Sequence, residues 1–319
     1  MATVGLSQPT VRVFVAGGSG VIGRALVPQL IAAGHFVAAT TRSKDKIEMV
    51  KSLGATPVLL DALDADAVIA AVVEYRPDVV MNQLTSLPKH YNPRNLRPWY
   101  EATSRLKVDG TGILLRAAAK VGARRFIYQS IAFMYENAGP PVLEEDAPLA
   151  LNAPEPFGGL VRTTAEGERL ATSTNEVTGV VLRYGQVYGA GTYYGPGSDF
   201  QRLAKARMLP VVGSGAGIFS FVHVNDAATA AVAALERGSG VYNITDDDPA
   251  PARDWILAYC RELGARPPLH VPAWIARIVA GSFASTAATE GRGASNRKAR
   301  EELGWTPSIP SWRGLLSAN

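Results

Sequence analysis

A glycine-rich turn between an apolar run and a helical pattern constrains the fold more than any other part of the sequence. Residues 11–16 form an apolar run as short as a buried strand, and Gly17, Gly20 and Gly23 follow it at GxxGxxG spacing. In a dinucleotide-binding fold the first glycine allows a tight turn, the second lets a pyrophosphate approach bare backbone, and the third lets the helix pack closely on its strand. The start of that helix offers free N–H groups to phosphates. The sequence therefore predicts a phosphate-binding turn on the first strand of a nucleotide-binding sheet.

Runs of strand length and helical patterns alternate along the first half of the chain. We expect strands over residues 36–40, 56–60, 79–81 and 125–129, and helices over residues 44–53, 65–75 and 99–120. Elements that alternate in this way form right-handed βαβ crossovers around a parallel sheet. We therefore predict an α/β fold with a Rossmann-like, doubly wound parallel sheet.

The strict alternation is lost after about residue 190. The later elements that we expect are an alanine-rich helix over residues 225–237, with Asn225 as its N-cap, a strand over residues 240–244, a helix over residues 252–263 and a last helix over residues 295–303. The predicted domains are an NAD(P)-binding Rossmann domain over residues 11–185 and a smaller substrate-binding lobe over residues 186–319, with residues 219–250 as a candidate return to the core sheet.

Composition excludes several classes of function. The chain is 47% hydrophobic and 19% charged, as in an ordinary globular protein, and its net charge of +4 is spread without the basic clusters of a nucleic-acid surface. Its single cysteine, Cys260, excludes an internal disulfide framework and fits a reducing compartment. No His/Cys/Asp cluster has metal-ligand spacing, and neither a leader pattern nor a membrane-spanning apolar run is present. We predict a soluble, cytoplasmic protein without metal, membrane or nucleic-acid partners.

The residues after the second and third expected strands indicate the cofactor. An acidic residue after the second strand holds the ribose hydroxyls of NAD, whereas an arginine suits the 2′-phosphate of NADP. This chain has Arg42 there and no acid, so we predict NADP(H) rather than NAD(H), with a solvated loop arginine as the alternative. Asp61, after the third strand, either accepts a hydrogen bond from the adenine amino group or caps the next turn. The polar and aromatic loop over residues 86–98 is either a substrate lid or a solvated connection.

Several further motifs resemble those of the extended short-chain dehydrogenase/reductases, the sugar-nucleotide epimerase and dehydratase group. They are VDGT at 108–111, QSIAFMY at 129–135, LRYGQVYG at 182–189, FVHVND at 221–226, VYNITDD at 241–247 and LGWTP at 303–307. The resemblance covers nearly the whole chain, and the order and spacing of the motifs are specific together. It implies the predicted fold, a nicotinamide cofactor and a small-molecule substrate.

The resemblance also implies the residues of the binding sites. The cofactor site would comprise Gly17, Ser19, Gly20, Val21, Ile22, Gly23, Thr41, Arg42, Asp61, Ala62, Leu84, Gln129 and Tyr184. The substrate site would comprise Gln186, Tyr188, Tyr193 and His223. His223 has a second interpretation, as a fixed core or loop anchor. In the family two long helices form a dimer bundle, so the helices over residues 99–120 and 160–173 would form the surface of a homodimer.

The chain departs from this family at its catalytic residues. The family's general acid is the tyrosine of a YxxxK pair, and here its position falls at residue 157 or 158, with the lysine position at 161 or 162, none of which is tyrosine or lysine. Lys107 stands at the position of the family's asparagine, and Ile131 at that of its serine. Because a positioned proton donor contributes about 10²- to 10⁴-fold in rate, another group must replace the tyrosine if the chain reduces carbonyls.

Three residues are candidates for that replacement: Lys107, Ser130 and Tyr135. A desolvated Lys107 ammonium can have its pKa lowered towards neutrality, although the residue can equally be a structural cation. Tyr135 can donate a phenolic proton or serve a structural role. We predict an atypical NADP(H)-dependent oxidoreductase of a small organic substrate. The alternatives are a redox-neutral epimerase or dehydratase with bound NAD(P), and a non-catalytic NADP(H)-binding sensor.

Overall fold

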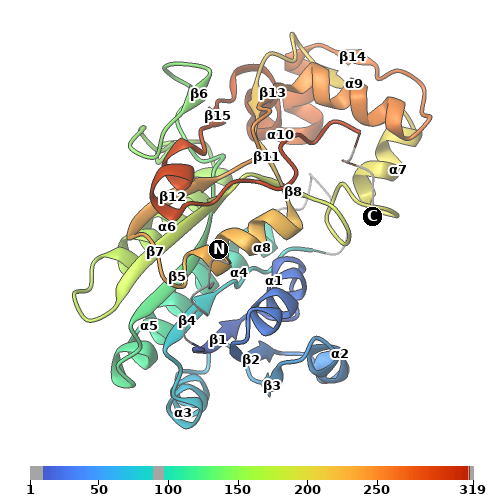
Figure 1. Cartoon of the computed structure of the whole chain (residues 1–319). Helices are drawn as coiled ribbons and strands as arrows, with labels where there is room; N and C mark the ends of the chain where they lie inside the picture. The colour runs from blue at the N-terminus through green and yellow to red at the C-terminus, as the bar shows by residue number, and fades with distance from the viewer. Residues whose placement is uncertain (1–9, 89–96, 315, 317–319) are drawn as a thin grey trace, which may run out of the picture.

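A seven-stranded parallel sheet forms the centre of the computed structural model, which describes residues 10–88, 97–314 and 316 (Figure 1). Its strands, in spatial order, are β12 (Gly240–Ile244), β7 (Thr178–Tyr184), β5 (Arg125–Ile131), β4 (Val79–Asn82), β1 (Arg12–Ala16), β2 (Phe36–Thr41) and β3 (Thr56–Leu59). Each neighbouring pair is parallel. The predicted doubly wound α/β sheet is therefore confirmed, and β12 adds a strand from the second half of the chain to its edge.

Helices cover both faces of this sheet. On one face lie α1 (Val21–Ala32) and α8 (Val224–Ala233), and on the other lie α3 (Ala65–Tyr75), α5 (Thr111–Lys120) and α6 (Phe157–Thr172). Successive strand side chains point to opposite faces, so Val13 and Val15 pack with α1 while Phe14 and Ala16 pack with α5. Because both faces are covered, the strands are apolar throughout, as in the sequence.

The long helix predicted over residues 99–120 contains an irregularity. It begins as α4 (Arg97–Arg105), passes through a π-helical turn (Leu106–Gly110) and continues as α5. Such a turn holds a wider loop of backbone than an α-helical turn, and it occurs here at Lys107. Within the predicted lid over residues 86–98, residues 89–96 lie outside the described residues.

Three other predicted helices differ in their limits. Residues 44–53 form a 3₁₀ turn (Lys44–Lys46) followed by α2 (Ile47–Ser52). The N-cap of α8 is His223 rather than Asn225, because His223 Nδ1 accepts a hydrogen bond from the Asn225 amide at 3.3 Å. The last predicted helix, over residues 295–303, ends in a π-helical turn (Ala299–Leu303).

A smaller lobe lies beyond the carboxyl ends of the strands (Figure 1). Its elements are helices α7 (Asp199–Lys205), α9 (Ala252–Glu262) and α10 (Ala273–Glu290), with short strands β6 (Val142–Leu143), β8 (Gln186–Tyr188), β9 (Val211–Val212), β10 (Ile218–Phe219), β11 (Phe221–His223), β13 (Ala250–Pro251), β14 (His270–Val271) and β15 (Gly293–Ala294). These strands form two-stranded pairs. A core of Phe221, Trp255, Tyr259 and Trp312 holds the lobe together and encloses the thiol of Cys260. The domain boundary at residue 185 stays a prediction.

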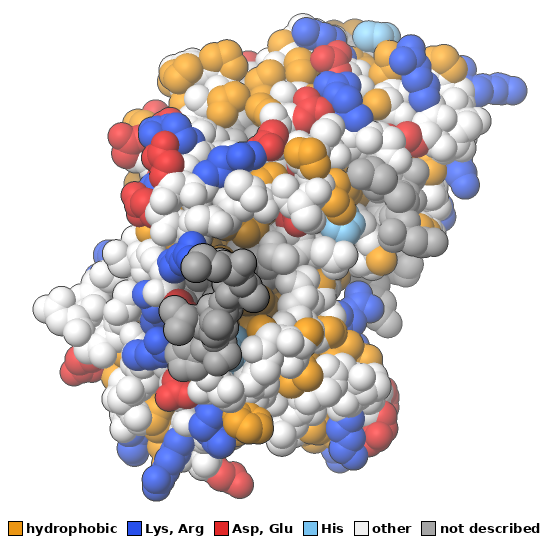
Figure 2. Space-filling model, viewed as in Figure 1, with side chains coloured by type: hydrophobic (Ala, Val, Ile, Leu, Met, Phe, Trp, Pro, Cys, Tyr) orange, Lys and Arg blue, Asp and Glu red, His pale blue; other side chains and the backbone are white. Residues whose placement is uncertain are grey.

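On the face shown in Figure 2, Lys and Arg side chains are interspersed with Asp and Glu, so charges of the two signs are mixed there. Among the described residues, no helix has both the length and the apolar character needed to cross a membrane.

Candidate active site

A cavity of about 1660 Å³ lies between the sheet and the smaller lobe. Its wall includes the glycine turn, the ends of β2, β4, β5 and β7, and residues of α4, α6 and α10. Ligand pockets for one small molecule usually measure about 300 to 1000 Å³. The cavity is therefore large enough for a dinucleotide together with a substrate, at the edge of the sheet where parallel α/β folds bind their ligands.

The glycine turn has the geometry of a phosphate cradle. Gly17 has a φ of +90°, and its amide donates to Thr40 Oγ1 at 3.0 Å. A Cβ on Gly18 would lie 2.6 Å from Ala39 Cβ, and a Cβ on Gly23 would lie 2.5 Å from the Gly17 carbonyl oxygen. Gly20 is the N-cap of α1 and has no side chain to bond the first amides of the helix. These amides are available to an anion, so the turn fits the pyrophosphate of a dinucleotide.

Cations line the cavity where β2 ends. Arg42, Ser43 and Lys46 belong to its wall, and the described residues of β2 and of the turn that follows it place no carboxylate there. Asp61 lines the cavity after β3, and its Oδ1 also accepts from the Leu63 amide at 3.0 Å. Asp61 therefore caps the next turn and still borders the cavity, which is compatible with both predicted roles.

Lys107 is the most unusual ionisable group on the wall. Its side chain is 3% exposed, and Nζ donates to the carbonyl oxygen of Gln129 and lies 4.7 Å from the centre of the Tyr128 ring. Burial lowers the pKa of the ammonium to about 7, although the carboxylate of Glu168 opposes this change. In the part of the chain that the structure describes, no hydrogen bond from Nζ to a second acceptor is found. The group can therefore exist in both protonation states near neutral pH.

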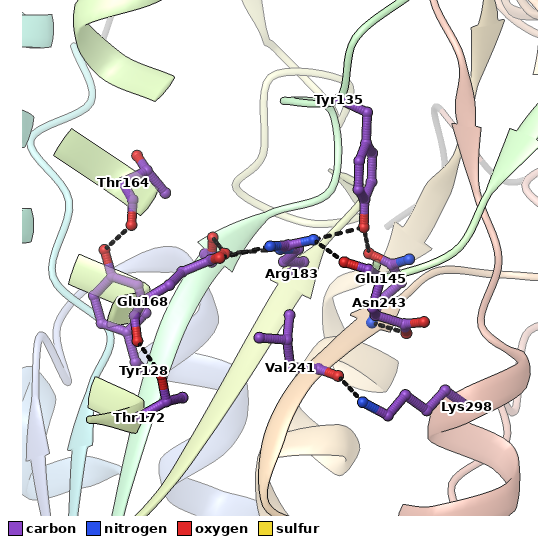
Figure 3. Close-up of polar contacts among 11 residues, drawn as sticks. Tyr128, Tyr135, Glu145, Thr164, Glu168, Thr172, Arg183, Val241, Asn243 and Lys298 are labelled. Carbon is purple, nitrogen blue, oxygen red and sulfur yellow. Dashed lines mark hydrogen bonds and ion pairs between the residues drawn. The ribbon is translucent and has the colours of Figure 1, made fainter. Parts of the chain in front are cut away.

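The other two predicted catalytic residues belong to a buried polar network: Tyr135 is labelled in Figure 3, and Ser130 joins the same network through Glu168. Glu168 and Arg183 form an ion pair with an oxygen–nitrogen distance of 2.6 Å, and Ser130 Oγ donates to Glu168 at 2.5 Å. Arg183 also donates to the Tyr135 hydroxyl at 2.8 Å, which donates in turn to Asn243 Oδ1 at 2.7 Å. Since the hydroxyls of Ser130 and Tyr135 are both committed to this network, neither is placed as a ready proton donor.

One face of α6 forms the wall where the family would place its tyrosine and lysine. Phe157, Leu160 and Thr164 line the cavity at helical spacing, and α6 contains no tyrosine or lysine. Of the predicted tyrosine and lysine positions, Phe157 lines the cavity and Val161 and Arg162 do not, so these positions stay a prediction.

Most predicted site residues reach the wall of the cavity. Those that line it are Gly17, Ser19, Gly20, Val21, Ile22, Thr41, Arg42, Asp61, Ala62, Leu84, Lys107, Gln129, Ser130, Tyr135, Tyr184, Gln186 and Tyr193. Gly23 packs instead behind the glycine turn. The predicted substrate residues Tyr188 and His223 do not line the cavity, because Tyr188 lies in the core of the smaller lobe and His223 caps α8. The anchor interpretation of His223 is the one that fits this position.

The end of the cavity beyond Lys107 has an aromatic wall that the sequence did not reveal. Trp99 and Phe133 line it, and the rings of Phe157 and Phe283 stack with their centres 3.7 Å apart. Arg292 also lines the cavity, and its buried Nε has no hydrogen-bond partner among the described residues. These side chains come from α4, the segment after β5, α6, α10 and the segment before β15, so only the tertiary fold assembles them. Among the described residues, no group of His, Cys, Asp or Glu is arranged to hold a metal ion.

The sequence is similar to those of known reductases and to one family model. Residues 13–245 match the model of the NAD-dependent epimerase/dehydratase family. A Streptomyces protein named 3-diazoavenalumate denitrifying reductase is 46% identical over 311 residues, which cover 96% of this chain and 99% of that protein. A ketoreductase of a farnesylated quinoline oxide from Stigmatella aurantiaca is 28% identical over 280 residues, covering 84% of this chain and 78% of that protein.

Solved structures are similar over nearly the whole chain. A Bordetella bronchiseptica enzyme in complex with NAD has a TM-score of 0.75 at 19% identity, covering 98% of this chain and 93% of its own. A human epimerase family protein with NADPH has a TM-score of 0.74 at 23% identity, covering 96% of this chain and 97% of its own. At these identities the likeness concerns the fold alone.

Proposed function

The chain belongs to the NAD-dependent epimerase/dehydratase family, and from this premise we propose that it is an NADP(H)-dependent reductase that replaces the diazo group of a flat carboxylate by hydrogen. That it is an oxidoreductase of this superfamily follows from the family and from the reductase relatives. What we propose beyond this is the preference for NADP(H) over NAD(H) and the diazo carboxylate substrate. We also include in it a homodimer and a cytoplasmic location, which rest on the sequence resemblance and on the single cysteine.

The observation that carries the proposal is the lack of a phenolic acid on α6. Reduction of a carbonyl produces an alkoxide, which needs a proton donor at the oxygen atom. On this wall α6 presents Phe157, Leu160 and Thr164, and it contains no tyrosine. Reduction of a diazo group on a ring that also carries an oxygen leaves no alkoxide: the hydride forms the new carbon–hydrogen bond, the carbon–nitrogen bond breaks, N2 leaves, and the proton goes to the ring oxygen, which becomes a phenol. A relative that is 46% identical carries the name of such a denitrifying reductase.

The bound cofactor would supply the hydride, and the chain's own residues would supply the proton and the orientation. Lys107 would hold the proton; its burial on the wall and its pKa of about 7, which allows donation near neutrality, support this role. The stacked rings of Phe157 and Phe283 suit a flat conjugated body. Arg292 offers a buried N–H to a carboxylate.

The proposed substrate class is tested with a diazotised aminohydroxycinnamate labelled with ¹⁵N. We expect loss of NADPH absorbance, equimolar ¹⁵N2 in the gas phase and a product with hydrogen at the former diazo carbon. The methyl ester, which lacks the charge for Arg292, should require a higher concentration. Turnover of the matching aryl ketone without turnover of the diazo compound would make the protein a carbonyl reductase. Binding of NADPH without turnover of either compound would make it a cofactor-binding sensor.

The cofactor preference is tested by reversing a charge at the end of β2. Arg42→Asp should weaken NADP(H) binding about 10- to 100-fold, because charge-assisted hydrogen bonds are worth about 1.5 to 3 kcal/mol, and should leave NAD(H) binding equal or tighter. Lys44→Asp is the matched control, since Lys44 belongs to the same turn but does not line the cavity. Isothermal titration calorimetry measures both affinities. An equal loss of NADP(H) affinity in both variants would show a general effect of charge and contradict a specific phosphate contact.

A further inference from the structure

Two buried polar side chains face the cavity without a hydrogen-bond partner. Gln83 is 4% exposed and Tyr184 is 1% exposed, and both line the cavity. Neither amide atom of Gln83 nor the hydroxyl of Tyr184 has a partner among the described residues. Buried polar groups are nearly always paired, and an unpaired one is unfavourable. Three unpaired atoms on one wall of the cavity therefore indicate that a polar group of a ligand forms hydrogen bonds with them.

The strand register places these two side chains on the same face of the sheet. Met81, two residues before Gln83, and Leu182, two residues before Tyr184, both pack under α1 and α8. Since side chains two apart in an extended segment point the same way, Gln83 and Tyr184 continue this face beyond the core and into the cavity. They are also neighbours: the Gln83 amide approaches the Tyr184 hydroxyl closely enough to lower the pKa of the phenol against the larger rise caused by burial, without reaching the geometry of a full hydrogen bond.

The order of the strands indicates which part of a dinucleotide reaches them. The cations at the end of β2 mark the adenosine side, and the glycine turn on β1 marks the pyrophosphate. The other end of the cofactor must then lie over β4, β5 and β7. Gln83 directly follows β4 and Tyr184 ends β7, and a Cβ on Gly17 would lie 2.7 Å from the Gln83 carbonyl oxygen. The pair therefore lies immediately beyond the phosphate turn, on the nicotinamide side.

The chemistry of the pair matches one group of the nicotinamide ring. The ring carries a carboxamide, which has one acceptor oxygen and one NH2 donor. The Gln83 amide offers the same two functions in complementary form, and the Tyr184 hydroxyl can both donate and accept. We infer that Gln83 and Tyr184 bind the nicotinamide carboxamide and so fix the rotation of the ring over the substrate. This inference rests on the proposed cofactor and adds the residues that recognise its reactive end.

The test compares NADP⁺ with its 3-acetylpyridine analogue, in which a methyl ketone replaces the carboxamide and only the NH2 donor is lost. Isothermal titration calorimetry on the full chain should give about tenfold tighter binding of NADP⁺ to the wild type, as expected for one lost hydrogen bond to a buried acceptor. In Gln83→Met and in Tyr184→Phe this preference should shrink towards equal affinity. Two variants are used so that misfolding of one leaves the other informative.

Tyr75→Phe is the matched control, because the Tyr75 hydroxyl is also buried and unpaired but does not line the cavity. It should keep the wild-type preference. An undiminished preference in both Gln83→Met and Tyr184→Phe would overturn the inference while leaving the proposed cofactor intact. Failure of the wild type to bind either dinucleotide would overturn the proposed function and this inference together.

Discussion

We expect Lys107→Met to lower turnover of the diazo substrate by about 10²- to 10⁴-fold, the range that a positioned proton donor contributes. Methionine has a similar length and is apolar, so it fills the buried site without leaving a charge. Lys107 lies on the wall at Gln129 and Tyr128, whereas the cations proposed to hold the adenosine side follow β2. Cofactor affinity should therefore change little. The measurement is kcat at saturating substrate, with NADPH affinity determined by calorimetry.

Turnover should depend on pH through the protonation state of Lys107. The donor is the protonated ammonium, and burial lowers its pKa to about 7. Turnover of the wild type should therefore be highest below pH 7 and fall as the pH rises through that value. Lys107→Arg serves as the control for charge, because a guanidinium stays protonated throughout this range and cannot release its proton. If Lys107→Met retained wild-type turnover, Lys107 would be a structural cation.

Stability offers a second measurement that does not depend on activity. The unfolded chain holds the Lys107 proton up to the ordinary pKa of 10.5, whereas the folded chain releases it near 7. Between these two values the unfolded state binds more protons, so this group makes the free energy of unfolding rise with pH. In Lys107→Met that contribution to the slope should disappear.

The second large effect is expected from Glu168→Leu. The side chains of Glu168 and Arg183 are 7% and 5% exposed, so the substitution leaves the guanidinium of Arg183 buried without its counterion. Breaking a buried ion pair from one side costs about 3 to 5 kcal/mol. The hydroxyl of Ser130 loses its acceptor at the same time. We expect the free energy of unfolding in urea to fall by about that amount.

Two further variants distinguish loss of the buried ion pair from a general effect of removing a glutamate from α6. Glu166→Ala removes another glutamate of α6, whose partner Arg169 is mostly exposed, and should cost about 0 to 1 kcal/mol. Glu168→Leu combined with Arg183→Met should recover much of the loss, because no unpaired charge remains. A Glu168→Leu protein as stable as Glu166→Ala would show that Arg183 is satisfied by its other partners.

The local sequence was enough to predict the sheet and the position of the glycine turn on its first strand. The conformation of the turn depends on glycines at fixed spacing, which Gly17, Gly20 and Gly23 show directly. The spacing of apolar residues predicts where strands and helices alternate. The sequence of the long helix could not reveal the π-helical turn at Lys107. Apolar spacing there continues across the irregularity, and the turn packs against α6 while its Lys107 reaches β5, contacts that no local pattern predicts.

Contacts between distant elements were the part that the sequence could not predict. The partners Glu168 and Arg183 stand on a helix and a strand, with no local pattern to join them. Tyr188 and His223 have the residue types of ligand-binding groups, yet one fills a core and the other caps a helix. Gln83 was missed because an amide at the end of a strand has no spacing signal, and only its unpaired state in the folded chain singles it out.

The enclosed thiol of Cys260 has a practical consequence for spectroscopy. The residue is 1% exposed in the core of the smaller lobe, and burial raises the pKa of its thiol, so the reactive thiolate is scarce at neutral pH. Because it is also the only cysteine in the chain, the native protein offers a silent background to maleimide dyes. Two cysteines introduced on the outer surfaces of α3 and α9 could carry a donor and an acceptor fluorophore. The distance between the sheet and the smaller lobe would then be readable in single molecules while cofactor and substrate enter the cavity.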